Sequence, residues 1–100
     1  MHEIQRTDVY DAWFAKLRDP NAKSRINTRL MRLGRGLVGD AKFVGGGVSE
    51  IRIDYGPGYR VYFMRRDKMV IVLLAGGDKR TQAKDIETAM ELVASIRSAK

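Results

Sequence analysis

Residues 48–75 read VSEIRIDYGPGYRVYFMRRDKMVIVLLA, and this stretch decides the fold. In its first two parts apolar and polar side chains alternate, which is the period of a β-strand with one buried face. The third part is apolar throughout, as in a strand that is buried on both faces. Glycine, proline and charged residues supply the turns between the parts. The stretch therefore predicts three consecutive antiparallel strands at residues 48–55, 59–64 and 69–75, with turns at 56–58 and 65–68.

The first predicted hairpin brings polar side chains together. With residues 56–58 as a three-residue loop, Tyr55 pairs with Tyr59 and Asp54 lies opposite Arg60. Two guanidinium groups and a phenol then come within reach on one face, although Asp54 could simply neutralise Arg60. The polar face carries Arg52, Asp54, Arg60 and Tyr62, and the core face carries Ile51, Ile53, Val61 and Phe63.

Towards the N-terminus, the pattern predicts a short strand and two helices. The strand falls at residues 3–6, and a helix that begins at an Asp8 cap runs to about Leu17. Asp19 before Pro20 is a stronger start signal, because an acidic N-cap is followed by proline in the first turn. This second helix runs to about Gly34, which is its expected C-cap. Its apolar face consists of Ala22, Ile26, Leu30 and Leu33.

Glycine-rich segments follow the second helix and the third strand. Residues 37–47 predict a mobile loop that carries Lys42 and Phe43. Gly76-Gly77 is expected to end the apolar strand, and a last helix begins at Asp78 or Thr81 and runs to about residue 98.

The order of elements is strand, helix, helix, three strands, helix. This order predicts an α+β fold in which a small antiparallel sheet carries the helices on one face. Residues 1–100 show no linker and are expected to form a single domain.

Charge points to a polyanionic partner. The chain has a formal net charge of +7 at pH 7, a pI near 10.1, and twelve Arg against seven Lys. Arginine binds phosphate through a planar fork, so the bias favours nucleic acid. Residues 20–39 contain no acid and carry Lys23, Arg25, Arg29, Arg32 and Arg35.

Three of these arginines have helical spacing. Arg25, Arg29 and Arg32 fall at i, i+4 and i+7, so a helix places them on one face. Like charges at this spacing repel, and a bound polyanion such as RNA backbone would relieve the repulsion, with Lys23 and Lys42 adding to the contact. A solvated helix face and a docking face for an acidic protein are the alternatives.

Composition excludes several classes of site. The chain has no cysteine and one histidine, His2, which excludes thiol chemistry, disulfides and a metal cage of several histidines. No apolar run of 18 residues is present, and the first residues do not resemble a secretory signal. We therefore expect a cytoplasmic protein that contacts no membrane and uses no metal or other cofactor.

Lys79 and Arg80 stand at the predicted start of the last helix. Cations there oppose the helix dipole, so binding of an anion would explain their placement. A solvated turn is the alternative.

The chain resembles the RelE/ParE/HigB superfamily of small bacterial toxins, most closely its HigB-like addiction-module killer proteins. The resemblance covers essentially the whole length and implies a RelE-like fold. It rests on the tryptophan-bearing first helix, KF at 42–43, VSEIRIDY at 48–55, GYRVYF at 58–63 and LLAGGDKRTQ at 73–82.

The resemblance implies a toxin that is a ribosome-dependent mRNA endonuclease. In the RelE branch a ribose 2′-hydroxyl attacks the adjacent phosphate without a metal, so the protein positions the strand and stabilises charge in the transition state. Arg60 matches the family's arginine in the middle strand, and Arg80, with Lys79 beside it, matches the basic position after the last strand. Arg52 stands where RelE has a lysine.

Two positions depart from RelE. Glu50 replaces another lysine, and Ile86 replaces the C-terminal tyrosine, so the acid–base pair of RelE is not reproduced. Glu50 is a candidate base, and a solvated carboxylate is the alternative. Tyr62 is a second candidate for proton transfer.

The resemblance also implies partners: the ribosome, mRNA, and an antitoxin with a helix-turn-helix domain encoded next to the toxin. A basic toxin would attract an acidic antitoxin. Two other functions stay open: a ParE-like inhibitor that binds DNA gyrase without catalysis, and a basic nucleic-acid-binding module.

Overall fold

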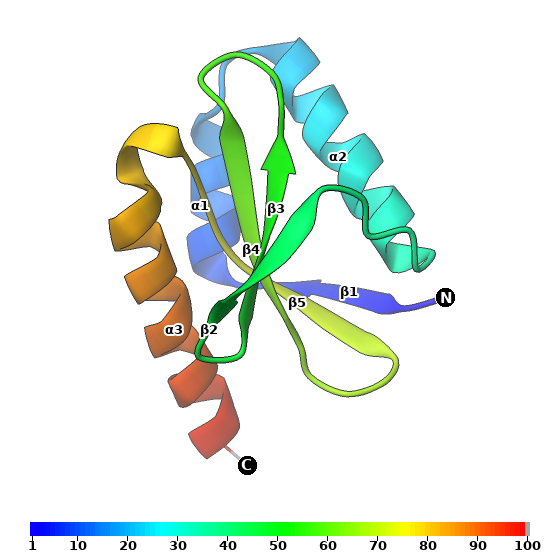
Figure 1. The fold of residues 1–100 in the computed structure, drawn as a ribbon, viewed down its shortest axis with the longest axis vertical. Coiled ribbons are helices and arrows are strands. Elements are labelled where there is room, and N and C mark those ends of the chain that lie inside the picture. Colours follow the sequence, from blue (N-terminus) through cyan, green and yellow to red (C-terminus); the bar gives the residue numbers. More distant parts are fainter. Residues whose placement is uncertain (100) are drawn as a thin grey trace.

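The computed structural model describes residues 1–99 of the chain. These residues form a five-stranded sheet and three α-helices. The helices pack on the sheet (Figure 1). The elements in chain order are β1 (Glu3–Arg6), α1 (Asp8–Lys16), α2 (Pro20–Gly34), β2 (Ala41–Gly45), β3 (Val48–Ile53), β4 (Tyr59–Arg65), β5 (Val70–Asp78), the 3₁₀ turn η1 (Lys79–Thr81) and α3 (Gln82–Ser98).

The sheet is mixed, with strand order β1-β5-β4-β3-β2. β3, β4 and β5 form the predicted antiparallel meander. β1 pairs with β5 in parallel, so the prediction of a purely antiparallel sheet is wrong. The connection between these two parallel neighbours consists of α1, α2 and the strands β2, β3 and β4.

The predicted loop at residues 37–47 contains a strand. β2 pairs with β3 in antiparallel fashion, with Ala41 opposite Ile51 and Lys42 opposite Glu50. Gly46 and Gly47 make the tight turn into β3, and both have positive φ, as does Gly45 at the end of β2. The glycines therefore mark a hairpin turn rather than a long mobile segment.

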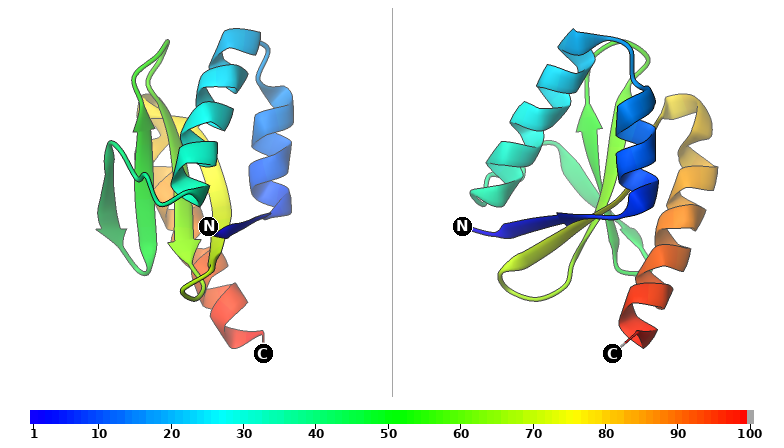
Figure 2. Two further views of the ribbon diagram at one scale, coloured as in Figure 1. Left: turned by 90° about the vertical axis from the view of Figure 1, so that its right-hand side faces the viewer. Right: turned by 180° about the vertical axis from the view of Figure 1, so that it is seen from behind.

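The helices cover both faces of the sheet, which corrects the prediction that they share one face. α1 and α2 pack on one face, and α3 packs on the other (Figure 2). On the α2 side, the buried Ala22, Ile26, Leu30 and Leu33 confirm the predicted apolar stripe. On the α3 side, Ala89 and Val93 pack against a cluster that includes Tyr62 and Leu74. Alternate strand residues thus serve two separate cores.

The helix starts follow from side-chain caps. The hydroxyl of Thr7, rather than Asp8, accepts a hydrogen bond from Tyr10 N and caps α1. Asp19 caps α2 through Asn21 N at 2.9 Å and is followed by Pro20, as predicted. Gly34 is the last helical residue of α2 rather than its cap.

β5 continues through Gly76-Gly77, where the sequence predicted its end. A Cβ on Gly76 would overlap the Trp13 ring, and a Cβ on Gly77 would overlap the Asp85 carboxylate. The glycines therefore let α1 and α3 approach the same strand from opposite sides.

The β3–β4 hairpin has a longer loop than predicted. Arg52 pairs with Arg60 and Ile53 with Tyr59, which leaves five residues, 54–58, in the loop. The predicted register is wrong by two residues. Because side chains alternate with a period of two, the two predicted faces are confirmed for the residues that lie in the strands, whereas Asp54 lies in the loop.

No α-helix within residues 1–99 is both long enough and apolar enough to span a membrane.

Candidate active-site cleft

A cleft of about 340 Å³ lies where the β3–β4 loop meets the end of β5. It contains three cations from three different segments and has a polar lining. Its residues are Asp40, Arg52, Asp54, Gly56, Pro57, Gly58, Arg60 and Lys79, and they are called the cleft below.

Arg52 and Arg60 are direct neighbours across β3 and β4, on the face that also carries α3. The Arg60 side chain is 11% exposed, and that of Arg52 is 36% exposed. Arg60 Nε is buried and has no hydrogen-bond partner among the described residues. A cation held this close to the protein interior attracts an anion more strongly than a solvated one, because water screens it less.

Glu50 lies behind these two arginines and is fully buried, so the alternative of a solvated carboxylate is wrong. Its Oε1 is 3.4 Å from Arg52 Nε and 3.9 Å from Arg60 Nε. Its Oε2 accepts a hydrogen bond from Gln82 Nε2 at 2.7 Å. Glu50 therefore ties β3 to β4 and to the first turn of α3.

Tyr62 is opposite Glu50 and is also fully buried. Burial, with the nearby Glu50 carboxylate, raises the pKa of the Tyr62 hydroxyl well above its usual value. The hydroxyl has no hydrogen-bond partner among residues 1–99. Neither Glu50 nor Tyr62 lines the cleft.

Lys79 is brought to the cleft by the turn that follows β5. Its backbone N–H donates to the Gly58 carbonyl at 3.1 Å, which joins η1 to the β3–β4 loop. Gly58 has a φ of +84°, and a Cβ on it would lie 3.3 Å from Lys79 Cδ. Glycine is required here because another side chain would be strained and would crowd the lysine.

Arg80 points elsewhere. Its Nη2 is 3.0 Å from Asp78 Oδ2, and its side chain is 82% exposed. The hydrogen bond from Arg80 lowers the pKa of Asp78. The structure thus brings Arg52, Arg60 and Lys79 together, and leaves Arg80 outside the cleft.

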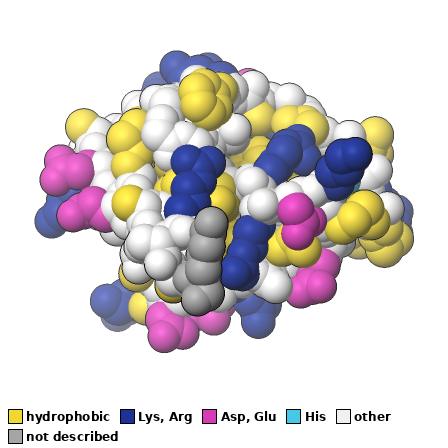
Figure 3. Space-filling model, turned by 90° about the horizontal axis from the view of Figure 1, so that it is seen from below, with side chains coloured by type: hydrophobic (Ala, Val, Ile, Leu, Met, Phe, Trp, Pro, Cys, Tyr) yellow, Lys and Arg dark blue, Asp and Glu magenta, His cyan; other side chains and the backbone are white. Residues whose placement is uncertain are grey.

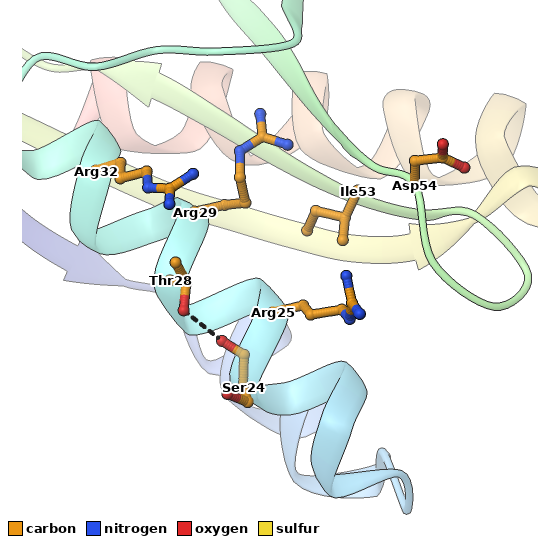
Figure 4. A pocket seen from close by; sticks show the side chains of 7 residues that line it. All are labelled: Ser24, Arg25, Thr28, Arg29, Arg32, Ile53 and Asp54. Carbon is orange, nitrogen blue, oxygen red and sulfur yellow. Dashed lines mark hydrogen bonds between the residues drawn. The ribbon is translucent and has the colours of Figure 1, made fainter.

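A second basic hollow of about 280 Å³ lies between α2 and the end of β3 (Figure 4). It is called the α2 pocket below, and its residues are Ser24, Arg25, Thr28, Arg29, Arg32, Ile53 and Asp54. Arg25 and Arg32 are exposed, whereas Arg29 is half-buried. The predicted stripe of three arginines is therefore present, but its members have different surroundings.

The other two predicted RNA contacts are separate from both hollows. Lys23 Nζ is 5.3 Å from the centre of the Phe14 ring. Lys42 is exposed on the edge strand β2, on the face of the sheet that carries Glu50.

The end of the molecule that carries the C-terminus looks different. Figure 3 shows basic, acidic and apolar side chains interspersed there. Among residues 1–99, no three His, Asp or Glu side chains are grouped so that they could hold a metal ion.

The sequence pattern assigns no role to three residues in or behind the cleft. Gln82 belongs to the LLAGGDKRTQ motif, and the packing of α3 brings its side chain to Glu50. Asp40 lies in the cleft because it precedes β2, which pairs with β3. Gly58 lies there because Lys79 packs on it. No local pattern signals these contacts, since each depends on a distant segment.

Residues 13–94 match a known family, described as "Phage derived protein Gp49-like (DUF891)". The chain belongs to this family. The matched Gp49-like segment includes every residue of the cleft and of the α2 pocket. An uncharacterized protein of Haemophilus influenzae is 45% identical over 94 residues, which cover 94% of this chain and 95% of that protein.

Proposed function

We propose that this Gp49-like protein is the toxin of a type II toxin–antitoxin module and cleaves mRNA on the ribosome. The observation that carries the proposal is the convergence of Arg52, Arg60 and Lys79 on one cleft. Three cations around a hollow of this size suit a phosphodiester that gains charge as it reacts. The resemblance to RelE/HigB toxins supports the same reaction class.

In the proposed reaction, a ribose 2′-hydroxyl attacks the adjacent phosphorus. The 5′-oxygen of the next nucleotide leaves with a proton, and a 2′,3′-cyclic phosphate forms. Arg60 and Lys79 stabilise the extra negative charge on the phosphoryl oxygens, and Arg52 holds the strand beside them. Arg80, 82% exposed and paired with Asp78, contacts RNA outside the cleft.

Glu50 is better placed to position the arginines than to move a proton. It is fully buried, and both its oxygens face donors: Arg52 and Arg60 at Oε1, and Gln82 at Oε2. A general base must reach the proton that it removes, and the cleft lining does not include Glu50. The acidic residues that do line the cleft are Asp40 and Asp54.

Binding partners complete the proposal. Lys23, Arg25, Arg32 and Lys42 contact RNA backbone, since they are basic side chains outside the cleft. A helix-turn-helix antitoxin encoded in the neighbouring reading frame neutralises the toxin. With a toxin charge of +7, an acidic antitoxin surface would speed their association.

A purified translation system tests the proposed activity. RNA 5′ ends are mapped with the wild-type protein on translating ribosomes and on the same mRNA without ribosomes. We expect cleavage only with ribosomes, and upstream products that end in a 2′,3′-cyclic or 3′-phosphate. Addition of EDTA to free-RNA controls checks for metal-dependent nucleases.

Two results would overturn this proposal. One is efficient cutting of free RNA. The other is intact mRNA on ribosomes together with inhibition of DNA gyrase supercoiling, which would favour the gyrase-binding alternative.

A further inference from the structure

The α2 pocket holds three positive charges without a carboxylate partner. No carboxylate oxygen of the described residues lies within 4.0 Å of the guanidinium nitrogens of Arg25, Arg29 or Arg32. Asp54 also lines this pocket, but Figure 4 shows its carboxylate turned away from the guanidinium groups. Like charges around one hollow repel, and a bound anion would relieve that repulsion.

The Tyr55 ring holds the Arg25 guanidinium in a position from which it can bind such an anion. Its guanidinium carbon lies 4.6 Å from the centre of the Tyr55 ring. The Tyr55 hydroxyl in turn donates to Asp19 Oδ2 at 2.8 Å, which fixes the ring against the start of α2. Stacking uses the flat face of a guanidinium group and leaves its N–H edge free for phosphate.

Arg29 contributes positive charge, but hydrogen bonds to backbone carbonyls hold its side chain in place. Its Nη1 donates to the Arg52 carbonyl at 2.6 Å, and its Nη2 donates to the Asp40 carbonyl at 3.2 Å. Carbonyl groups satisfy the donors but do not neutralise the positive charge. Arg25 and Arg32, whose side chains are exposed, are therefore the residues that can move to contact a ligand.

The α2 pocket and the cleft meet at the end of β3. Asp54 lines both hollows. Consecutive side chains of a strand point to opposite faces, so Arg52 enters the cleft while Ile53 forms part of the α2 pocket. A flexible strand with regularly spaced phosphates can pass from one hollow to the other, whereas a rigid duplex cannot bend around a strand end.

We propose that the α2 pocket is a second phosphate site for the same single RNA strand whose scissile phosphate occupies the cleft. This inference rests on the proposed function for the role of the cleft. It adds that the substrate is a single strand held at two points, with Arg25 and Arg32 gripping a neighbouring phosphate. Backbone contacts of this kind fix the register of the strand without reading its sequence.

The test measures binding of RNA that cannot be cut. Oligouridylates with 2′-fluoro sugars carry no attacking hydroxyl, and they are prepared with two and with six nucleotides. Backbone amide NMR shifts of the wild-type protein locate each ligand. We expect the two-nucleotide ligand to shift Gly58 and Lys79, and the six-nucleotide ligand to shift Ser24 and Arg32 as well.

Two double variants make the test specific. Arg25→Gln/Arg32→Gln removes the two exposed positive charges of the α2 pocket. Arg65→Gln/Arg66→Gln removes two exposed positive charges near the β4–β5 turn and is the matched control. For the first variant we expect at least about a tenfold loss of affinity for the six-nucleotide ligand and an unchanged two-nucleotide affinity. Its salt dependence should flatten by about 0.7 per lost phosphate contact. The control should keep both affinities within about twofold, because remote charges are screened.

Several outcomes would overturn the inference. They are an equal loss in both double variants, an equal loss for both ligand lengths, or unchanged RNA binding with a collapse of antitoxin affinity. The last result would make the pocket a protein-docking site. Because the ligands are uncleavable and no ribosome is present, two-point binding without ribosomal cleavage would refute only the proposed nuclease activity. Cleavage without two-point binding would refute only this inference.

Discussion

Arg29 Nη1 donates a hydrogen bond of 2.6 Å to the backbone carbonyl oxygen of Arg52. The side chain of Arg52 lines the cleft, and its backbone N–H donates to the Asp40 carbonyl, which Arg29 also binds. One arginine of α2 thus fixes the end of β3 and the segment before β2. The shape of the cleft depends on a helix that contributes no side chain to its lining.

We expect Arg29→Gln to lower the free energy of unfolding by about 1.5–3 kcal/mol, since its bonds to carbonyls are charge-assisted. Arg32→Gln, an exposed change on the same helix, should stay within about 0.5 kcal/mol. Chemical denaturation of both variants measures the difference. Equal stability of the two variants would mean that the contact to Arg52 does not hold the strand end.

Glu50→Ala should be among the most damaging single changes near the cleft. It leaves the Arg60 guanidinium with 11% side-chain exposure and without its carboxylate, and removing one partner of a buried pair costs about 3–5 kcal/mol. Glu50→Gln keeps the shape and should cost less. Thermal unfolding of both variants, with Glu91→Ala as an exposed control, tests this order. A Glu50→Ala protein as stable as the control would contradict the assigned role.

Trp13 and Gly76 should be energetically coupled. Trp13→Ala deletes a large ring from the core of the α1 side, at a cost of about 3–5 kcal/mol. Gly76→Ala should also destabilise, because its Cβ would overlap that ring. Once the ring is gone, the same alanine should cost much less. A double-mutant cycle in denaturant measures the coupling, and strictly additive effects would show that the two residues do not touch.

Asp85→Asn should stabilise the protein at neutral pH. Burial raises the pKa of Asp85 above its ordinary value near 3.8. The folded state therefore binds this proton more tightly than the unfolded state does. At pH values above the pKa that Asp85 has in the folded state, its ionisation lowers the free energy of unfolding. That penalty fades as the pH falls through the folded pKa towards 3.8. The amide can still accept the Thr81 hydroxyl, which donates to Asp85 Oδ2 at 2.6 Å.

The measurement for Asp85→Asn is the denaturation midpoint at pH 7 and at pH 3.5. We expect a higher midpoint than wild type at pH 7 and little difference at pH 3.5. Glu87→Gln, an exposed change on the same helix, should show no such pattern. A variant that is less stable than wild type at pH 7 would contradict the assigned effect of burial.

The sequence predicts the faces of the hairpin better than its register. Alternation assigns Arg52 and Arg60 to one face and Ile51 to the other, and a slip of two residues leaves those faces unchanged. The register itself depends on a five-residue loop stabilised by contacts such as Lys79 N–H to the Gly58 carbonyl, from a segment that is distant in sequence.

The errors in the fold predicted from the sequence have a shared cause. The sequence pattern predicts that glycine interrupts regular structure at residues 45–47 and 76–77. The first group instead forms a hairpin turn, and the second leaves room for Trp13 and Asp85. Local propensity cannot show what packs on a glycine. Which face of the sheet α3 covers and whether Glu50 is buried likewise depend on tertiary contacts. One of them is the hydrogen bond from Gln82 to Glu50.

The rate at which Arg60→Lys cleaves mRNA on ribosomes tests directly whether the cleft is the active site. The variant keeps the charge but loses the planar fork, and Arg65→Lys changes an exposed arginine of the same strand as the matched control. Both variants are first checked for wild-type folding by the fluorescence of Trp13, the single tryptophan. We predict that Arg60→Lys cuts about 10²-fold more slowly and that Arg65→Lys cuts at the wild-type rate. A folded Arg60→Lys protein that cuts as fast as wild type would contradict the assignment of the cleft as the active site.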